Sequence, residues 1–218
     1  MINERSIGIV DNLDAFCFHI LGCGAIGSSV AMQLARMGAQ DLVLHDFDKV
    51  EIENVGVSQY FQNDIGKLKV DALKEHIKAV DDDITVISHA KRFDEWEKSN
   101  KPADVVILGF DSMASRLEAV TIITNSSKFN QPMLMIDGRM GAEHYQQYLF
   151  LKPTLKSYLK SWYSDEDGDP EPCNAKATSY CSNMSGSFIV NAIRKFVMKQ
   201  PLDMELSFNF PTTMIQAR

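Results

Sequence analysis

Apolar runs alternate with segments of helical periodicity through the first two-thirds of this 218-residue chain. Short continuous apolar runs predict buried strands, whereas apolar positions three and four residues apart predict helices packed on them. Strands are expected at residues 16–21, 41–45, 84–88, 104–109 and 133–137, and helices at 25–37, 66–80 and 112–129. Elements in this order predict an α/β fold with a doubly wound, mainly parallel sheet and helices on both faces.

The final third, residues 138–218, breaks this rhythm. Its pattern predicts an antiparallel strand at 145–151, a helix at 185–198 and a last strand at 205–210, with an exposed acidic loop at 164–172. No repeat or linker divides the chain. We therefore expect one domain over 1–218, with a Rossmann-like core at 1–137 and an irregular, partly antiparallel remainder formed by a crossover loop, a helix and a final strand.

The first expected strand leads into a G-x-G-x-x-G turn that opens a helix. The turn comprises Gly22, Cys23, Gly24, Ala25, Ile26 and Gly27. Free backbone N–H groups and the helix dipole at such a turn favour a phosphate group. Asp46 lies nineteen positions after Gly27, at the end of the second expected strand, where a dinucleotide-binding fold places an acid on a ribose hydroxyl. The pattern favours a nucleotide site over a glycine turn kept only for close packing.

Further charged residues stand at the ends of the next elements. Asp48 follows the second strand, Lys69 lies in the helix at 66–80, and Asp111 follows the strand at 104–109. Ligands bind beyond the carboxyl ends of parallel strands, so these side chains are candidates to contact the phosphates. Each has a structural alternative. Asp46 and Asp48 could close a strand, Lys69 could be one of several solvated helix lysines, and Asp111 could cap the following helix.

Taken together, these elements make residues 16–120 resemble the ubiquitin-activating enzyme superfamily, in particular its small bacterial ThiF/MoeB-like adenylyltransferases. A weaker similarity reaches residue 198. That family shows a G-x-G-x-x-G turn, an acidic strand end, a stretch with Asn, Arg and Gln, a G-x-x-K, and a later Asp followed by Arg. The matching positions here are Gly22, Gly24, Gly27, Asp46, Asp48, Val50, Asn54, Gln59, Gly66, Lys69, Asp111 and Arg116.

The resemblance implies an ATP site with assigned roles. Asp46 would hold the ribose, Asn54 would lie close to the phosphates, and Asp48 and Gln59 would also contact the nucleotide. Lys69 would neutralise phosphate charge, and Asp111 would bind a Mg²⁺ ion that bridges the triphosphate. A lysine and a metal suit adenylation because attack of a carboxylate on the α-phosphate builds charge on the phosphate oxygens.

The resemblance also implies an activity and its partners. We expect ATP-dependent activation of a carboxylate as an acyl adenylate. The expected carboxylate is the C-terminal glycine of a small ubiquitin-like or sulfur-carrier protein that ends in Gly-Gly. A homodimer is expected on the same basis.

One arginine of the family pattern is missing. The segment from Asn54 to Gln59 is one residue longer than in the family and contains no arginine. Arg139, just past the strand at 133–137, is the candidate replacement because it should emerge at the same sheet edge. The alternative is a structural arginine paired with Asp137 or Glu143.

Two other arginines have separate expected roles. Arg5 is a second candidate, since related enzymes reach an N-terminal arginine across a dimer interface. Arg116 is expected to be a surface or packing residue.

The last third contains a candidate nucleophile. Cys173 follows the acidic segment and precedes the end of the last helix, where thiamine-pathway relatives carry a reactive cysteine. Its thiol could accept the acyl group as a thioester or link to a partner's sulfur; the alternative is a loop cysteine. Lys176 would lower the thiol pKa and the neighbouring acids would raise it. Cys181 is expected to be packed.

Composition narrows the remaining choices. A net charge of −7 argues against a nucleic-acid binder, and no apolar run approaches the roughly 20 residues that span a membrane. The four cysteines contain no C-x-x-C pair, so we expect no zinc, and a reducing, cytoplasmic location. Two other functions stay open: an NAD-dependent oxidoreductase that uses the same glycine turn, and a catalytically degenerate scaffold that binds nucleotide.

Overall fold

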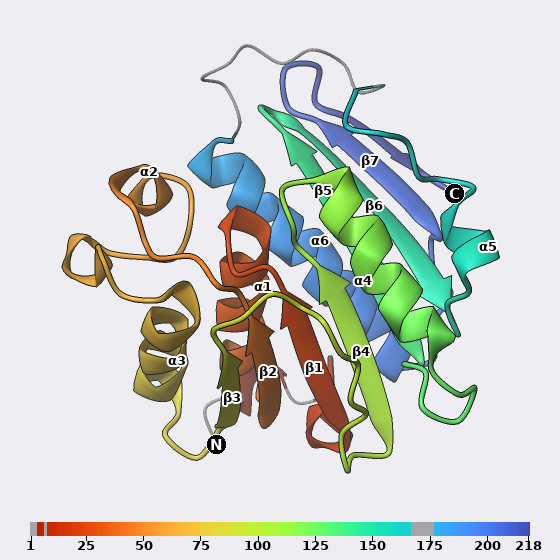
Figure 1. Cartoon of the computed structure of the whole chain (residues 1–218), viewed down its shortest axis with the longest axis horizontal. Helices are drawn as coiled ribbons and strands as arrows, with labels where there is room; N and C mark the ends of the chain where they lie inside the picture. Colours follow the sequence, from red (N-terminus) through yellow and green to blue (C-terminus); the bar gives the residue numbers. More distant parts are fainter. Residues whose placement is uncertain (1–3, 7, 167–176) are drawn as a thin grey trace.

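One eight-stranded sheet forms the centre of the protein (Figure 1). The computed structural model describes residues 4–6, 8–166 and 177–218. The strand order is β3-β2-β1-β4-β5-β6-β7-β8, in which the first five strands of this order pair in parallel and the last three are antiparallel. The strands are β1 (Phe16–Leu21), β2 (Asp41–His45), β3 (Thr85–His89), β4 (Ala103–Leu108), β5 (Leu134–Gly141), β6 (His144–Leu151), β7 (Glu205–Asn209) and β8 (Met214–Ala217). The predicted fold class, a parallel core with an antiparallel C-terminal part, is confirmed.

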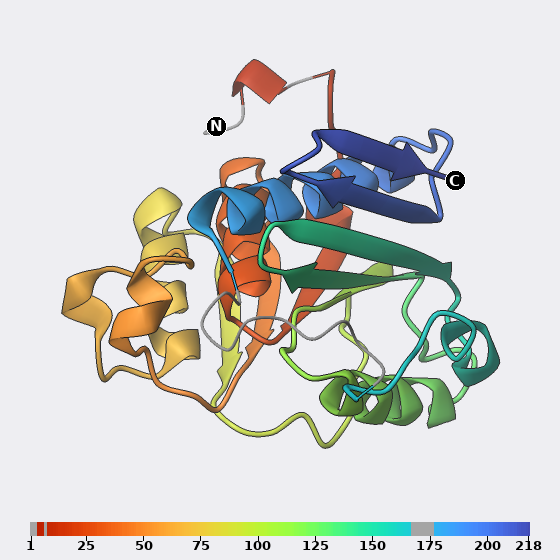
Figure 2. The same cartoon turned by 90° about the horizontal axis from the view of Figure 1, so that it is seen from above.

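Helices cover both faces of this sheet, as the edge-on view shows (Figure 2). One face carries α1 (Ala25–Arg36), α3 (Lys69–Val80) and α6 (Ser179–Val197), and the other carries α4 (Met113–Asn125) and α5 (Leu155–Tyr158). A short α2 (Ile52–Val55) and a 3-10 turn (Gln62–Asp64) lie between β2 and α3, and two more 3-10 turns (Glu4–Ser6 and Leu13–Ala15) precede β1. None of the helices in the described part of the chain is long and apolar enough to cross a membrane.

Two apolar clusters, one on each face, hold the helices to the sheet. Phe18 and Ile20 of β1 belong to the cluster under α1 and α6, whereas Leu21 belongs to the cluster under α4. Central parallel strands are buried on both faces, and this is why their sequences read as continuous apolar runs. All six residues of β4 are buried. The same property made these strands easy to predict.

The C-terminal third contains the largest differences from the expected elements. The strand predicted at 205–210 is not the last one, because β8 follows it and forms the edge of the sheet. α6 begins at Ser179, earlier than predicted, because Thr178 caps it by accepting a hydrogen bond from the backbone N–H of Cys181. α2, α5 and β8 each have four residues, too few to show a period in the sequence.

Candidate functional site

The glycine turn joins β1 to α1 through a close backbone approach. Gly22 has a φ of +92°, which disfavours other residues, and its N–H donates to the His45 carbonyl at 2.8 Å. Across the turn, a Cβ added to Gly27 would lie 1.9 Å from the Gly22 carbonyl oxygen. A Cβ added to Gly24 would meet nothing within 4 Å. Gly22 and Gly27 are therefore required by the turn, whereas Gly24 leaves open space at the helix N-terminus.

Asp46, at the end of β2, is built into this turn. One carboxylate oxygen accepts a hydrogen bond from the Cys23 N–H at 2.8 Å, and the other accepts one from the Asp48 N–H at 2.8 Å. Burial raises the pKa of Asp46, and the Lys69 charge and the two N–H groups only partly offset that effect. The acid therefore fixes the positions of the turn and of Asp48.

A backbone pairing brings Lys69 to Asp48. Lys49 and Leu68 form an antiparallel bridge, and the Lys69 N–H donates to the Asp48 carbonyl at 2.9 Å. As a result, the Lys69 ammonium lies 3.0 Å from a carboxylate oxygen of Asp48. Burial opposes its charge, but attraction from Asp46, Asp48 and Asp111 outweighs burial and raises the Lys69 pKa. Lys69 is only 9% exposed, so it is not one of the solvated lysines of its helix.

Asp111 follows β4 and is exposed. It does not cap α4, because the Ser112 hydroxyl accepts from the Ser115 N–H and Asp165 accepts from the Met113 and Ala114 N–H groups. The Asp111 carboxylate has no hydrogen bond or ion pair with another described residue, although it attracts Lys69. The capping alternative is therefore wrong, and this carboxylate is available to a ligand.

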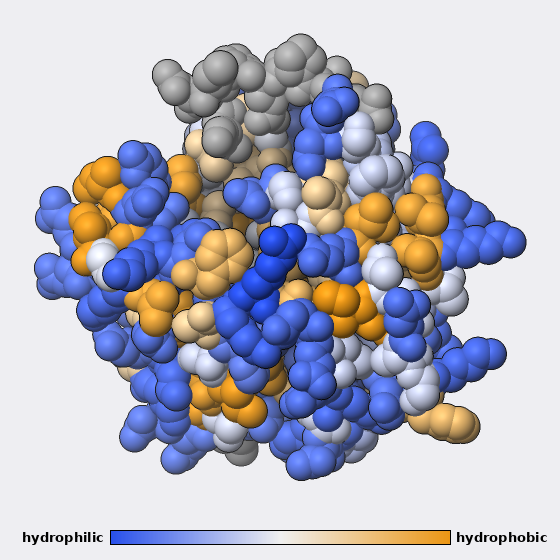
Figure 3. All heavy atoms as spheres, in the orientation of Figure 1, coloured by the Kyte–Doolittle hydropathy of each residue, from blue (hydrophilic) through white to orange (hydrophobic). Residues whose placement is uncertain are grey.

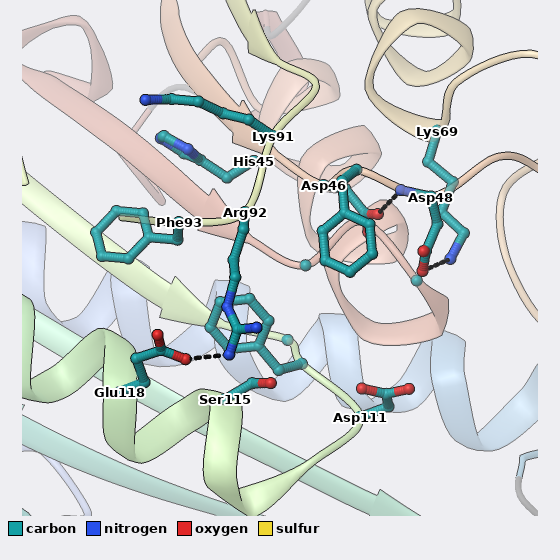
Figure 4. A pocket seen from close by; sticks show the side chains of 15 residues that line it. His45, Asp46, Asp48, Lys69, Lys91, Arg92, Phe93, Asp111, Ser115 and Glu118 are labelled. Atoms are coloured by element: carbon teal, nitrogen blue, oxygen red, sulfur yellow. Dashed lines mark hydrogen bonds and ion pairs between the residues drawn. The ribbon is translucent and has the colours of Figure 1, made fainter. Parts of the chain in front are cut away.

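These groups meet at a cavity of about 290 Å³ beyond the carboxyl ends of the parallel strands (Figure 4). Its lining consists of Gly22, Gly24, His45, Asp46, Phe47, Asp48, Lys69, Lys91, Arg92, Phe93, Gly109, Phe110, Asp111, Ser115 and Glu118. Asp46, Asp48 and Lys69 lie on one side, and Arg92, paired with Glu118, lies on another. The cavity therefore combines glycine backbone, acids and cations at the position where α/β folds bind ligands.

Comparison with known proteins agrees with this geometry. Residues 7–209 match the ThiF family. The chain belongs to the ThiF family. Ubiquitin-like modifier-activating enzyme 5 of Oryza sativa subsp. japonica is 32% identical over 89 residues, which are 39% of this chain and 21% of that protein. The adenylyltransferase and sulfurtransferase MOCS3 of Caenorhabditis briggsae is 23% identical over 150 residues, which are 66% of this chain and 37% of that protein. The chain thus spans only about a fifth to two fifths of the length of these relatives.

Solved structures share the fold. The crystal structure of E. coli MccB with ATP has a TM-score of 0.75 at 18% identity, covering 100% of this chain and 67% of that one. The crystal structure of PaaA has a TM-score of 0.73 at 19% identity, covering 94% of this chain and 64% of that one. The ThiF-type sheet is therefore common to proteins of low sequence identity.

Several residues that the ThiF pattern suggested do not line the cavity. Asn54 instead accepts from the Glu51 N–H at 2.9 Å and caps α2, and the Gln59 amide donates to Asn183 at 2.8 Å. Three residues at the start of α1, Ala25, Ile26 and Gly27, are also absent from the lining. The direct contacts of Asn54 and Gln59 therefore hold the segment between β2 and α3 rather than the cavity wall.

Arg139 does not reach the cavity either. Its guanidinium donates to Asp137 at 2.7 and 2.9 Å and to the Ser161 carbonyl at 2.7 Å, and it lies over the Tyr148 ring. This placement corresponds to the structural alternative, and it argues against Arg139 as the replacement for the missing family arginine. Each of its guanidinium nitrogens already has a partner.

The other arginine expectations have different outcomes. Arg116 is buried and pairs with Asp137 while donating to the Leu108 and Phe110 carbonyls, so it packs as expected and holds the chain just before Asp111. Arg5 is exposed in the first 3-10 turn and is not part of the lining.

The structure describes one of the two C-terminal cysteines and not the other. Cys173 and Lys176 lie outside the described residues. Cys181 is buried in the first turn of α6, and burial raises its thiol pKa to about 11. This thiol is packed, as expected.

The segment after β3 also lines the cavity, although none of its residues is among the predicted site residues. Lys91, Arg92 and Phe93 enter the cavity because β3 ends at the same sheet edge as β1 and β2. The signal was present, since residues that follow a parallel strand belong to the ligand edge. Arg92 is a cation on the cavity wall, which Arg139 is not.

Proposed function

We propose that this chain carries out ATP-dependent adenylation of a carboxylate. The supporting observation is the convergence of Lys69, Asp48 and Asp111 with the glycine turn on one cavity. At about 290 Å³, the cavity is close to the lower end, roughly 300 Å³, of typical small-molecule sites. A dinucleotide site would need the glycine turn and Asp46, but nothing in hydride transfer calls for a buried lysine held between acids.

The residues of the cavity fit the steps of this reaction. Gly22 and Gly24 of the glycine turn line the cavity and would lie against the triphosphate, and Lys69, charged and held by Asp48, would neutralise the phosphate oxygens. A carboxylate oxygen of the second substrate attacks the α-phosphorus, a new P–O bond forms, and pyrophosphate leaves. Because Lys69 is already in place, its charge needs no reorganisation as negative charge develops.

Mg²⁺ suits the free carboxylate of this cavity. Asp111 has no partner among the described residues, and carboxylate oxygens are the ligands that Mg²⁺ prefers. Asp111 would hold the ion, which when bound would neutralise charge on the phosphates. The position of Asp111 depends on the contact of Arg116 with the Phe110 carbonyl, next to it in the chain.

The expected second substrate is a protein or peptide that ends in a free carboxylate. Curated relatives are named as ubiquitin-like modifier-activating enzymes, and MccB structures contain MccA, which supports a polypeptide terminus over a small acid. We propose the C-terminal glycine of a small ubiquitin-like or sulfur-carrier protein ending in Gly-Gly. We propose that the Cys173 thiolate then attacks the carbonyl of the acyl adenylate, forming a thioester as AMP leaves. We also propose that the protein acts in the cytoplasm.

A ligand screen and an exchange assay test the proposal together. ATP with Mg²⁺ should raise the melting temperature, whereas NAD(H) should not. ATP–pyrophosphate exchange should then require a carrier protein ending in Gly-Gly. Lys69→Met should lower that exchange by about 100-fold or more, because it removes a charge that stabilises the transition state.

Lys78→Ala is the matched control for Lys69. Lys78 is in the same helix, but its ammonium binds only exposed groups of Asp82. Exchange should be unchanged in this variant. Stabilisation by NAD(H) and not by ATP would favour the oxidoreductase, and ATP binding without exchange for any carrier would favour the degenerate scaffold.

A further inference from the structure

Three side chains of types that ligate metals lie together toward the opposite end of the sheet from the cavity described above. Cys17 and His19 lie two positions apart on β1, and Asp104 is the register partner of Cys17 on β4. Side chains two apart on a strand share a face, so all three project to the same side. Their thiol, imidazole and carboxylate donor atoms lie within 4.8 Å of one another.

The cluster is buried, and one of its polar atoms has no hydrogen-bond partner among the described residues. Cys17, His19 and Asp104 are 3%, 4% and 1% exposed. One Asp104 oxygen is hydrogen-bonded to the His19 ring at 2.9 Å and accepts from the Ser99 N–H at 3.1 Å. The other oxygen is buried and has no partner among the described residues. A buried carboxylate oxygen without a partner is costly, and a bound cation would remove that cost.

The donor set selects the kind of cation. Sulfur, nitrogen and oxygen donors at about 2.0–2.3 Å in a tetrahedral arrangement are typical of Zn²⁺, while Mg²⁺ and Ca²⁺ prefer oxygen alone. A thiolate and a carboxylate together balance the two positive charges of the ion, and neutral complexes are the least costly to bury. Three protein ligands would leave a fourth position for water.

An exposed segment without helix or strand packs against the cluster. Residues 91–100 contain no helix or strand, and most of them are exposed. The Trp96 ring of this segment lies 4.7 Å from the His19 ring, and the Ser99 N–H contacts Asp104. The start of the same segment, Lys91 to Phe93, lines the nucleotide cavity. An ion bound at the cluster would therefore brace the segment that forms one cavity wall.

We propose that Cys17, His19 and Asp104 bind one Zn²⁺ ion. This site is separate from the adenylation site and does not depend on the proposed function. It is also invisible to a search for closely spaced cysteines, because His19 and Asp104 are 85 positions apart. The expectation of no zinc rested on that search.

Metal titration of the whole chain tests the site. Protein stripped with a chelator is titrated with Zn²⁺ against a chromophoric competitor, and with Co²⁺ as a spectroscopic substitute. We expect one equivalent of Zn²⁺ and a thiolate-to-cobalt charge-transfer band. Cys17→Ser should abolish the band and weaken Zn²⁺ binding by more than about 100-fold, since even loss of an outer-shell partner costs up to about 100-fold. Cys181→Ser, at a buried cysteine of α6, should leave both unchanged.

Two results would overturn the proposal. One is the absence of stoichiometric Zn²⁺ binding by folded wild-type protein. The other is a charge-transfer band that persists in Cys17→Ser. If that variant does not fold, His19→Gln replaces it, and a Zn²⁺ affinity equal to that of wild type in this folded variant would equally contradict the site.

Discussion

At the residue scale, His45 shows how the cavity wall is made. It ends β2 and is 8% exposed, and its ring stacks on His89 with centroids 4.4 Å apart. Burial, followed by the nearby His89 and His19 rings, lowers the pKa of His45 to about 3. Its Nδ1 atom has no hydrogen-bond partner among the described residues. The ring is therefore neutral at physiological pH and adds no charge beside the acids and cations of the cavity.

The lowered pKa of His45 predicts acid sensitivity. An unfolded histidine binds its proton below about pH 6.5, whereas folded His45 does so only near pH 3. The free energy of unfolding therefore carries no protonation penalty from His45 above pH 6.5. It decreases as the pH falls from 6.5 toward 3, because the unfolded state binds a proton that the folded state does not. His45→Gln should flatten this part of the stability profile by up to about 1.4 kcal/mol per pH unit, measured by urea unfolding. His144→Gln, at an exposed histidine of β6, is the control, and parallel profiles for wild type and His45→Gln would contradict the prediction.

At the element scale, the junction of β1, α1 and β4 is the most constrained part of the chain. The Gly109 N–H donates to the Leu21 carbonyl at 2.7 Å, and a Cβ on Gly109 would lie 2.9 Å from the Gly22 oxygen. A Cβ on Gly27 would lie closer still to the same oxygen, at 1.9 Å. The three backbones therefore approach too closely for side chains at Gly22, Gly27 and Gly109.

A pair of glycine variants tests this junction. Gly27→Ala should destabilise the protein by at least about 3 kcal/mol and remove ATP binding, because its Cβ would overlap the Gly22 carbonyl. Gly24→Ala should retain wild-type unfolding, since its Cβ meets open space, and any effect should appear in ATP affinity alone. Chemical denaturation and ATP titration measure the two effects. Equal stability of the two variants would show that the close approach is not required.

Elements were predictable where their period was long enough to read. β1 and β2 have the predicted bounds, since each is an apolar run that ends at a polar or glycine residue. α3 begins at Lys69 rather than residue 66, because Gly66 adopts a φ of +89° and Lys67 and Leu68 are used by the bridge to residues 49 and 50. Bridges between distant backbone segments leave no periodic signal.

At the scale of the whole molecule, the surface is mostly hydrophilic but carries apolar patches (Figure 3). One lies over the segment between β2 and α3, where Ile52, Phe61 and Ile65 are exposed. Exposed apolar area of this kind is typical of surfaces that bind another protein. The resemblance to ThiF/MoeB-like enzymes leads us to expect a second copy of this chain as one such partner.

The homodimer prediction is tested by mass in solution. Light scattering coupled to size exclusion should give about twice the mass of the 218-residue chain at micromolar concentration. The dimer should persist on dilution if the interface is large and apolar, because such interfaces are the stable ones. A monomeric mass across the whole concentration range would contradict the prediction.

The sequence by itself determined the parallel core, the glycine turn, and the acids and lysine at the sheet edge. These features are local, so the residue types show them directly. Strands buried on both faces are continuous apolar runs, the turn requires glycines, and polar residues follow the strand ends. Tertiary structure alone decided that Arg139 binds Asp137 and that Ser112 and Asp165 cap α4 in place of Asp111. It also brought Cys17 and His19 to Asp104. Those outcomes depend on contacts between positions far apart in the chain, and no local pattern carries that information.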